Sequence, residues 1–220
     1  MDYQNLINTV KEIVQIEFKE ESTGHDWHHI ERVYNTACFI QTKEGGNRVI
    51  VELAALLHDI SDHKFNGGNL NAGGEIAFTI LIKNGCEESI ALQVKKIVDS
   101  VSFKGAKVKD EIESLEGQIV QDADRLDAIG AIGIARAFAF GGNRNRPLYE
   151  PDSSPTLHGS FDEYSKSKSH TINHFHEKLL LLRDRLHTET AKIIGKERHS
   201  FMEDFLKQFH KEWDLNKTNN

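Results

Sequence analysis

The chain has 220 residues, of which 38% are hydrophobic and 28% are charged, and its formal net charge is −7. This is the composition of an ordinary globular protein, long enough to bury a core without stapling disulfides. The negative charge argues against a general affinity for nucleic acid. No stretch reaches the roughly 18 consecutive apolar residues of a membrane span. We therefore expect neither a nucleic-acid nor a membrane partner.

Cysteine usage and the N-terminal segment indicate a cytoplasmic protein. Cys38 and Cys86 are the two cysteines, and neither belongs to a C-x-x-C motif. Two isolated cysteines in a chain of this length are typical of reduced thiols. Residues 1–15 are amphipathic and carry early acids, which is not the pattern of a signal peptide.

The hydrophobic period is helical along the chain, and no alternation argues convincingly for a strand. A first helix has Leu6, Val10 and Val14 on one face. A second helix can begin after Asp26 as its N-cap and end at the glycine pair 45–46. The pattern therefore predicts an all-α fold.

A third predicted helix carries the apolar run 54–57 and ends in a Gly- and Asn-rich loop over 61–74. Further helices are expected at about 74–83 and 87–102. Residues 117–140 are predicted to form one long helix. Its interior glycines, at 130 and 133, each weaken a helix by about 1 kcal/mol, and close approach by another helix would compensate.

Residues 141–168 interrupt the helical pattern and contain all three prolines of the chain. A loop of this length in a compact domain is usually a lid or disordered, and we expect it near the site. The last helices are predicted over 171–194 and 197–213. We expect one domain over 1–220, with a core at about 20–140 that is completed by C-terminal helices at about 169–215.

Three segments place imidazoles and carboxylates beside apolar helical positions. They are "HDWHHIERV", "LLHDISDHK" and "QDADRLDAIG", within a chain that has 12 histidines. Each segment alone could be a cap, a surface hydrogen bond or a solvated acidic turn. Together they could supply two imidazoles and two carboxylates to one divalent ion. A mixed N/O set suits Mn, Fe, Co, Ni or Zn better than Ca.

The order His…His-Asp…Asp resembles the HD superfamily of metal-dependent phosphohydrolases. The segments "GHDWHHIERV", "LLHDISD", "DADRLDAIGAIGIAR" and "NHFHEKLLLL" are similar to a bacterial, YpgQ/YedJ-like subfamily over most of the chain. The resemblance implies a multi-helix HD-domain bundle. It also implies four metal ligands, which are His29, His58, Asp59 and Asp124.

The fourth ligand has two competitors in the same segment, Asp122 and Asp127. In a helix Asp122 lies about 200° around the axis from Asp124, so the two do not easily face one ion. HD enzymes with two metals add histidines between the His-Asp pair and the last Asp, whereas only His63 lies there in this chain. This favours a single divalent ion, with Mn²⁺ preferred over Mg²⁺, Co²⁺, Ni²⁺, Fe²⁺ or Zn²⁺.

Two residues beyond the His-Asp pair are the candidates for catalysis. Asp62 could orient or deprotonate the attacking water, and it could equally be a turn residue. Lys64 could neutralise charge that develops on the phosphate. Six further cationic side chains are candidates for binding substrate, and these are Arg32, Arg125, His174, Lys178, Arg144 and Arg146. Helical arginines more often pair with nearby acids, and the two loop arginines could simply be solvated.

The resemblance implies a nucleotide substrate, and hydrolysis of (d)NTPs to monophosphate and pyrophosphate through a metal-activated water is the favoured reaction. The chain has no Gly-x-x-x-x-Gly-Lys-Ser/Thr loop, so a nucleotide would be held through the metal. A nucleoside monophosphatase or cyclic-nucleotide phosphodiesterase is the near alternative. An iron-dependent oxygenase and a non-catalytic binding module are more distant ones. The sequence does not indicate which nucleotide base is preferred or whether the protein forms a homodimer.

Overall fold

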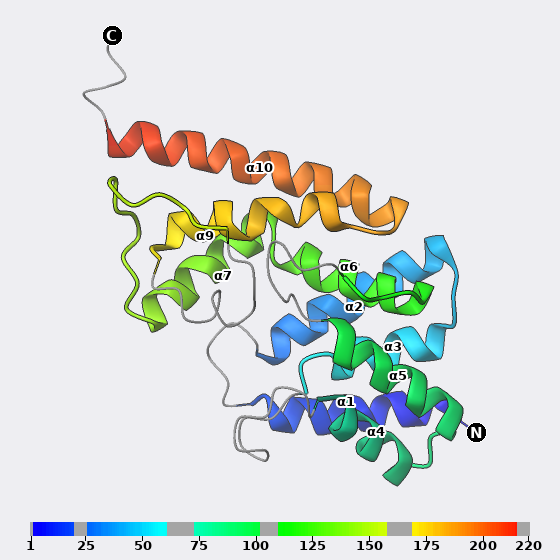
Figure 1. Ribbon diagram of the computed structural model, residues 1–220. Coiled ribbons are helices and arrows are strands. Elements are labelled where there is room, and N and C mark those ends of the chain that lie inside the picture. Colours follow the sequence, from blue (N-terminus) through cyan, green and yellow to red (C-terminus); the bar gives the residue numbers. More distant parts are fainter. Residues whose placement is uncertain (1, 20–25, 61–72, 102–109, 158–168, 215–220) are drawn as a thin grey trace.

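Figure 1 shows the computed structural model of the protein. The structure describes residues 2–19, 26–60, 73–101, 110–157 and 169–214. Asp62 and Lys64, the candidates for catalysis, lie outside these residues.

The described part of the chain is helical, as predicted, with no strand. It contains nine α-helices and two short 3₁₀ helices. The α-helices are α1 (Tyr3–Glu17), α2 (Trp27–Glu44), α3 (Arg48–Leu57), α4 (Gly73–Lys83), α5 (Glu88–Val101), α6 (Leu115–Asp127), α7 (Gly130–Asn143), α9 (Thr171–Glu177) and α10 (Glu189–Trp213). None of them is long and apolar enough to cross a membrane.

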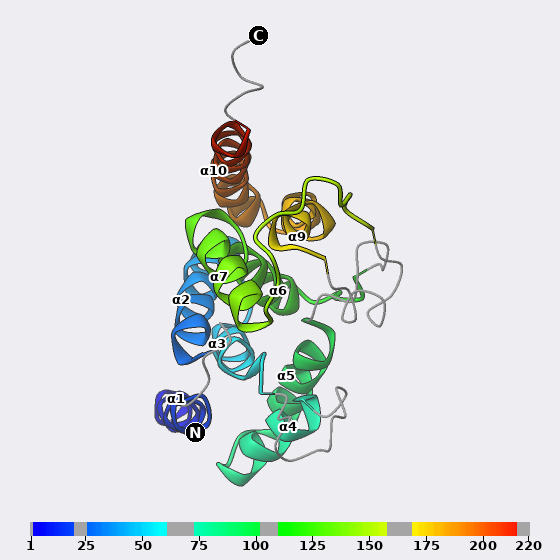
Figure 2. The ribbon, with the colours of Figure 1, turned by 90° about the vertical axis from the view of Figure 1, so that its left-hand side faces the viewer.

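Helix α3 is the centre of the core. Every residue from Ile50 to Leu57 is buried, because α3 packs against α1, α2, α5 and α6. Figure 2 shows α3 enclosed by these neighbours. The one charged residue of this stretch, Glu52, accepts a hydrogen bond from Arg48 Nε at 2.5 Å. The residues that follow α3 directly, His58 and Asp59, are therefore attached to the most enclosed helix of the core.

The bounds of α2 follow the predicted capping residues. Asp26 accepts a hydrogen bond from the backbone N–H of His29 at 2.9 Å, which satisfies an otherwise unpaired donor of the first turn. Gly45 ends the helix with φ +86°, a conformation that favours glycine. The N-cap thus fixes the turn that carries His29.

The prediction of one long helix over residues 117–140 is wrong, because the chain breaks between α6 and α7. Gly130 has φ +76°, which a continuous α-helix does not allow. A Cβ atom at Gly130 would lie 3.0 Å from Cγ of Arg198 on α10. The expected close approach by another helix therefore occurs at Gly130, while a Cβ at Gly133 would meet the carbonyl oxygen of Ala128.

The last helices also differ from prediction. Helix α9 is short, 3₁₀ turns follow at Leu179–Leu181 and Arg183–Arg185, and α10 then runs without interruption from Glu189 to Trp213. No proline or glycine marks the break at 178–188. A tertiary contact fixes it instead, since Asp122 of α6 accepts hydrogen bonds from the backbone N–H groups just before α10. Helix α10 packs across α7, α6 and α2 (Figure 1).

The predicted loop starts later than expected, since α7 continues to Asn143. Residues 144–157 are described and contain no helix or strand. Residues 158–168 lie outside the description, so the expectation of a lid stays a prediction.

Candidate metal centre

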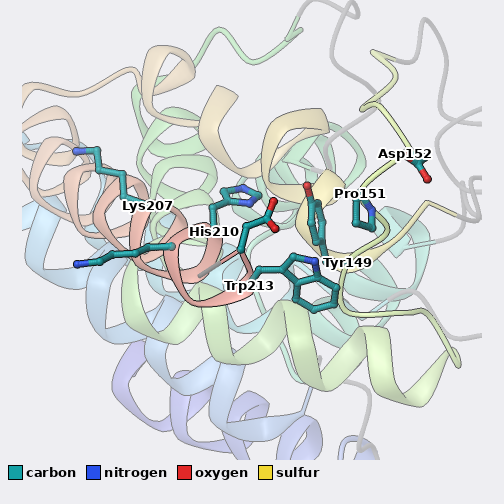
Figure 3. Close-up of a pocket in the computed structure, with 8 residues that line it drawn as sticks. Tyr149, Pro151, Asp152, Lys207, His210 and Trp213 are labelled. Carbon is teal, nitrogen blue, oxygen red and sulfur yellow. The ribbon is translucent and has the colours of Figure 1, made fainter. Parts of the chain in front are cut away.

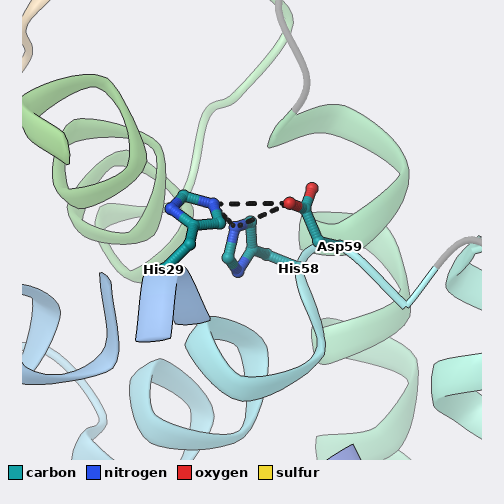
Figure 4. Close-up of side chains that lie close together, drawn as sticks. All are labelled: His29, His58 and Asp59. Carbon is teal, nitrogen blue, oxygen red and sulfur yellow. Dashed lines mark hydrogen bonds and ion pairs between the residues drawn. The ribbon is translucent and has the colours of Figure 1, made fainter. Parts of the chain in front are cut away.

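Two imidazoles and two carboxylates from three parts of the chain meet at one point. His29 belongs to the first turn of α2, His58 and Asp59 form the turn that ends α3, and Asp124 belongs to α6. Figure 4 shows the first three side chains converging. We call the four residues the His–Asp cluster.

The distances within the cluster are those of groups that can share one ion. His29 Nε2 lies 3.2 Å from His58 Nε2, 3.3 Å from Asp59 Oδ2 and 3.6 Å from Asp124 Oδ1. His58 Nε2 lies 3.6 Å from Asp59 Oδ2 and 3.9 Å from Asp124 Oδ1. Candidate ligand atoms of His29, His58 and Asp59 all lie within 4.8 Å of one another.

The second nitrogen of each ring fixes the orientation of the first. His29 Nδ1 lies 2.7 Å from Asp127 Oδ2, and His58 Nδ1 lies 2.8 Å from the carbonyl oxygen of Ala55. Both partners are acceptors, so each Nδ1 carries the proton and each neutral ring presents an Nε2 lone pair to the cluster. Two lone pairs 3.2 Å apart repel unless a cation or a proton lies between them. This donor set fits a divalent metal ion.

The cluster is buried on the imidazole side and open on the carboxylate side. The side chains of His29 and His58 are 0% and 1% exposed, whereas those of Asp59 and Asp124 are 23% and 30% exposed. An ion or a phosphate can therefore approach across the carboxylates, while the rings are held by the core.

The electrostatics of the cluster require a positive charge. Burial lowers the pKa of His29, but hydrogen bonds to Asp127 and Asp59 outweigh this effect and raise it to about 9. The nearby charge of Asp124 acts in the same direction. A proton meets this requirement in the metal-free protein, and a divalent ion would meet it in the metal-bound one.

The three aspartates of the "DADRLD" segment have three different surroundings. Asp124 faces the ε nitrogens of the cluster. Asp127 faces His29 Nδ1, on the other side of the ring. Asp122 is buried away from both, where burial raises its pKa and it accepts bonds from the backbone N–H groups of His187 and Thr188. The geometry thus favours Asp124 as the fourth ligand.

Two of the predicted substrate-binding arginines form ion pairs. Arg32 donates from Nε to Asp127 at 2.6 Å, and Arg125 donates to Asp110 at 2.6 Å and to the carbonyl oxygen of Arg185 at 2.5 Å. Arg125 is only 3% exposed. These contacts correspond to the structural alternative that the sequence left open.

The structure gathers the other four predicted substrate-binding residues at α7, α9 and the loop after α7. Burial lowers the pKa of His174 to about 3, and the positive charges of Lys178 and Arg146 contribute. The guanidinium groups of Arg144 and Arg146 lie 5.4 and 5.6 Å from the ring centre of Phe140. The four residues therefore lie in one neighbourhood, in which Lys178 and the two arginines are cations and His174 is neutral at pH 7.

Sequence reasoning missed two residues that support the cluster. The sequence presents Asp127 only as a competing ligand, although its i, i+3 spacing from Asp124 places both on one helix face. No sequence signal points to Arg136, which donates to Asp127 at 2.7 Å. Its position depends on the break between α6 and α7, which the helical pattern did not reveal.

A separate hollow of about 540 Å³ lies between the end of α10 and the loop after α7. Figure 3 shows the rings of Tyr149, His210 and Trp213 beside it. The hollow shares no residue with the His–Asp cluster or with the predicted substrate-binding residues.

A family model and a curated relative match this chain. The sequence model of the HD domain family matches residues 26–129, a range that contains the whole cluster. The chain is 40% identical to the uncharacterized protein YpgQ of Bacillus subtilis over 200 residues, which cover 90% of this chain and 89% of the relative.

Solved structures extend the likeness to nearly the whole chain. A Lactobacillus plantarum protein has a TM-score of 0.86 at 32% identity, covering 98% of this chain and 100% of that one. An HD-superfamily hydrolase from Bacillus thuringiensis has a TM-score of 0.75 at 39% identity, covering 96% and 98%. YpgQ in complex with ADP has a TM-score of 0.76 at 35% identity, covering 96% and 97%. The chain therefore belongs to the HD superfamily, with relatives described as hydrolases.

Proposed function

We propose that the protein is a divalent-metal-dependent phosphohydrolase that cleaves (d)NTPs to nucleoside monophosphate and pyrophosphate. The observation that carries the proposal is the His–Asp cluster, with its two opposed Nε2 atoms and its two partly exposed carboxylates. The ADP complex of YpgQ supports a nucleotide as the class of substrate.

The four residues of the cluster would hold one ion. His29 and His58 would bind through Nε2, and Asp59 and Asp124 through the carboxylate oxygens that face these nitrogens. A bound divalent ion would lower the pKa of a coordinated water and polarise a phosphoryl oxygen. Mn²⁺ suits this N/O set, and Mg²⁺, Fe²⁺, Co²⁺, Ni²⁺ and Zn²⁺ are the ions to compare with it.

The charge balance around the cluster suits an anionic substrate that arrives with a metal ion. The carboxylates of Asp59, Asp124 and Asp127 are negative, and the Arg32 and Arg136 guanidinium groups that contact Asp127 are positive. With neutral imidazoles, these five groups sum to one negative charge. In the metal-free protein the proton on His29 balances this charge. A divalent ion in its place would leave one positive charge, which would attract phosphate within a negatively charged protein.

Further residues are proposed for the phosphates and the leaving group. Arg146 and Lys178 are cations beside the neutral ring of His174, and Arg144 lies near them on Phe140. Asp62 as the group that orients water and Lys64 as the phosphate-binding cation stay predictions from the sequence. We assign Arg32 and Arg125 to structural ion pairs.

The decisive experiment is product analysis with metal-stripped protein. The protein is incubated with ATP, dATP and the other nucleoside triphosphates, with and without Mn²⁺, and the products are separated by ion-exchange chromatography. We expect nucleoside monophosphate and pyrophosphate in equal amounts, only with metal. His58→Ala should reduce the rate to that of the metal-free protein.

The alternatives are separated by repeating the assay with nucleoside monophosphates and cyclic nucleotides and by measuring the metal content of the protein. Orthophosphate released from a nucleoside monophosphate would support a monophosphatase, and cleavage of a cyclic nucleotide would support a phosphodiesterase. Two irons per chain would point to an oxygenase. Metal binding without turnover of any nucleotide would indicate a binding module.

A further inference from the structure

Asp127 is a buried carboxylate with three cationic or polar partners and a direct contact to the cluster. Its Oδ2 lies 2.7 Å from His29 Nδ1 and 2.7 Å from Arg136 NH1. Arg32 binds both oxygens side-on, with Nε 2.6 Å from Oδ1 and NH2 3.0 Å from Oδ2. The side chain is 5% exposed. These contacts join α2, α6 and α7 at one carboxylate.

Four donors point at the two oxygens of Asp127, so the side chain must accept hydrogen bonds on both oxygens. Only a group that accepts on both oxygens satisfies all four. The paired guanidinium groups prevent the carboxylate from turning, so the acceptor that faces His29 Nδ1 is held in place. The ring of His29 is then fixed in both its plane and its tautomer.

The geometry points to Asp127 as a positioning residue, which acts through His29 and holds its Nε2 lone pair toward the ion of the His–Asp cluster. The inference rests on the metal site of the proposed function, but not on the substrate or the reaction. It also assigns Arg32 and Arg136 a role in the site that needs no contact with substrate, because they orient the carboxylate that orients the ligand.

The two histidines differ in what supports them. His58 Nδ1 donates to a backbone carbonyl, that of Ala55, which no side-chain substitution removes. His29 depends on a side chain from another helix. A substitution at Asp127 should therefore act on one ligand of the pair and leave the other in place.

The test is a comparison of Asp127→Asn with Asp122→Asn. An amide at position 127 replaces one acceptor with a donor, so it must oppose either His29 Nδ1 or a guanidinium group. Asp122 is the matched control, because it is a buried carboxylate of the same helix whose partners are the amides and hydroxyl of His187 and Thr188. Both variants lose acceptors in the core, but only Asp127→Asn disturbs a cluster residue.

The first measurement is the dissociation constant for Mn²⁺, by competition with a chelator of known affinity. We expect Asp127→Asn to weaken binding about 10- to 100-fold, and Asp122→Asn to bind as the wild type does. Equal affinities of Asp127→Asn and wild type would overturn the inference. Equal weakening by both variants would also overturn it, since that is the result of general damage to α6.

The second measurement reads the tautomer in the wild-type protein. In long-range ¹H–¹⁵N spectra of the Zn²⁺-loaded wild type, we expect His29 to be protonated on Nδ1 and bound through Nε2. His29→Asn identifies the resonances. The opposite tautomer in the wild type would overturn the inference whatever the variants do. A wild type with the expected tautomer and no nucleotide hydrolysis would refute the proposed function and leave this inference standing.

Discussion

A single imidazole shows how the site balances burial against charge. His29 is fully buried, which disfavours its charged form, yet Asp127, Asp59 and Asp124 surround it with negative charge. The hydrogen bonds and charges prevail, and the pKa rises from 6.5 to about 9. The ring therefore holds a proton at neutral pH, which a metal ion bound at the cluster would have to displace.

This proton predicts a pH dependence of stability in the metal-free protein. A group whose pKa is raised on folding stabilises the protein fully below its unfolded pKa, and the contribution is lost as the pH rises through the folded one. The contribution of His29 should therefore decline between about pH 6.5 and pH 9. Thermal unfolding of chelator-treated protein across this range measures it, and His29→Asn should lack this component.

The affinity of the protein for a metal ion should show the opposite pH dependence to the stability of the metal-free protein. Since the ion competes with the proton on His29, apparent metal affinity should rise with pH over the same range, and binding at pH 7 should release about one proton. Titration calorimetry in buffers of different ionisation enthalpy counts the released protons. An enthalpy that does not vary with the buffer would contradict the raised pKa.

At the scale of elements, the break between α6 and α7 places the supports of the site. Because the chain turns at Gly130, Arg136 returns from α7 to Asp127 at the end of α6. Arg198 of α10 fixes the same turn by donating to the carbonyl oxygen of Leu126 at 2.5 Å. A continuous helix would carry Arg136 away from Asp127 at 1.5 Å per residue.

Two glycines of α7 test this account of the break. Gly130→Ala introduces a Cβ at φ +76°, 3.0 Å from Arg198 Cγ, and should destabilise the protein by about 1–3 kcal/mol. Gly142→Ala is the matched control, because Gly142 is helical and, apart from the adjoining residues and backbone of its own helix, no atom lies within 4 Å of the new Cβ. It should be neutral or stabilise by up to about 1 kcal/mol. Urea unfolding gives both values, and a neutral Gly130→Ala would refute the strain at the turn.

The sequence predicted the ligand-bearing elements because their signals are local. Two signals can be recognised from spacing alone: an N-cap three residues before His29, and an apolar run that ends directly before His58. The supports depend on tertiary contacts instead. The acidic partner of Arg125 is Asp110, in a segment without helical pattern, and the start of α10 is set by Asp122. An interior glycine such as Gly130 is compatible with either a weak helix or a break.

At the scale of the molecule, charge should make nucleotide binding conditional on the metal. The net charge is −7, and with the proton on His29 the groups around the cluster sum to zero without the ion. A non-hydrolysable triphosphate analogue should therefore bind measurably only when Mn²⁺ is present, and more weakly as salt is added. Equilibrium dialysis with and without chelator measures this. Equal binding in both conditions would place the nucleotide at another site.

That the whole chain forms one domain stays a prediction.

The position of His58 and Asp59 at the end of α3 bears on how the ion exchanges. Because α3 is enclosed by four helices, its amides should exchange with solvent only when the whole core opens. The carboxylates, in contrast, face outward. An ion held by the cluster would thus be able to exchange with solvent without unfolding of the core. The resting protein would then carry whichever divalent ion its surroundings supply. The metal found after purification would reflect the ions in the medium and not a fixed selectivity of the site.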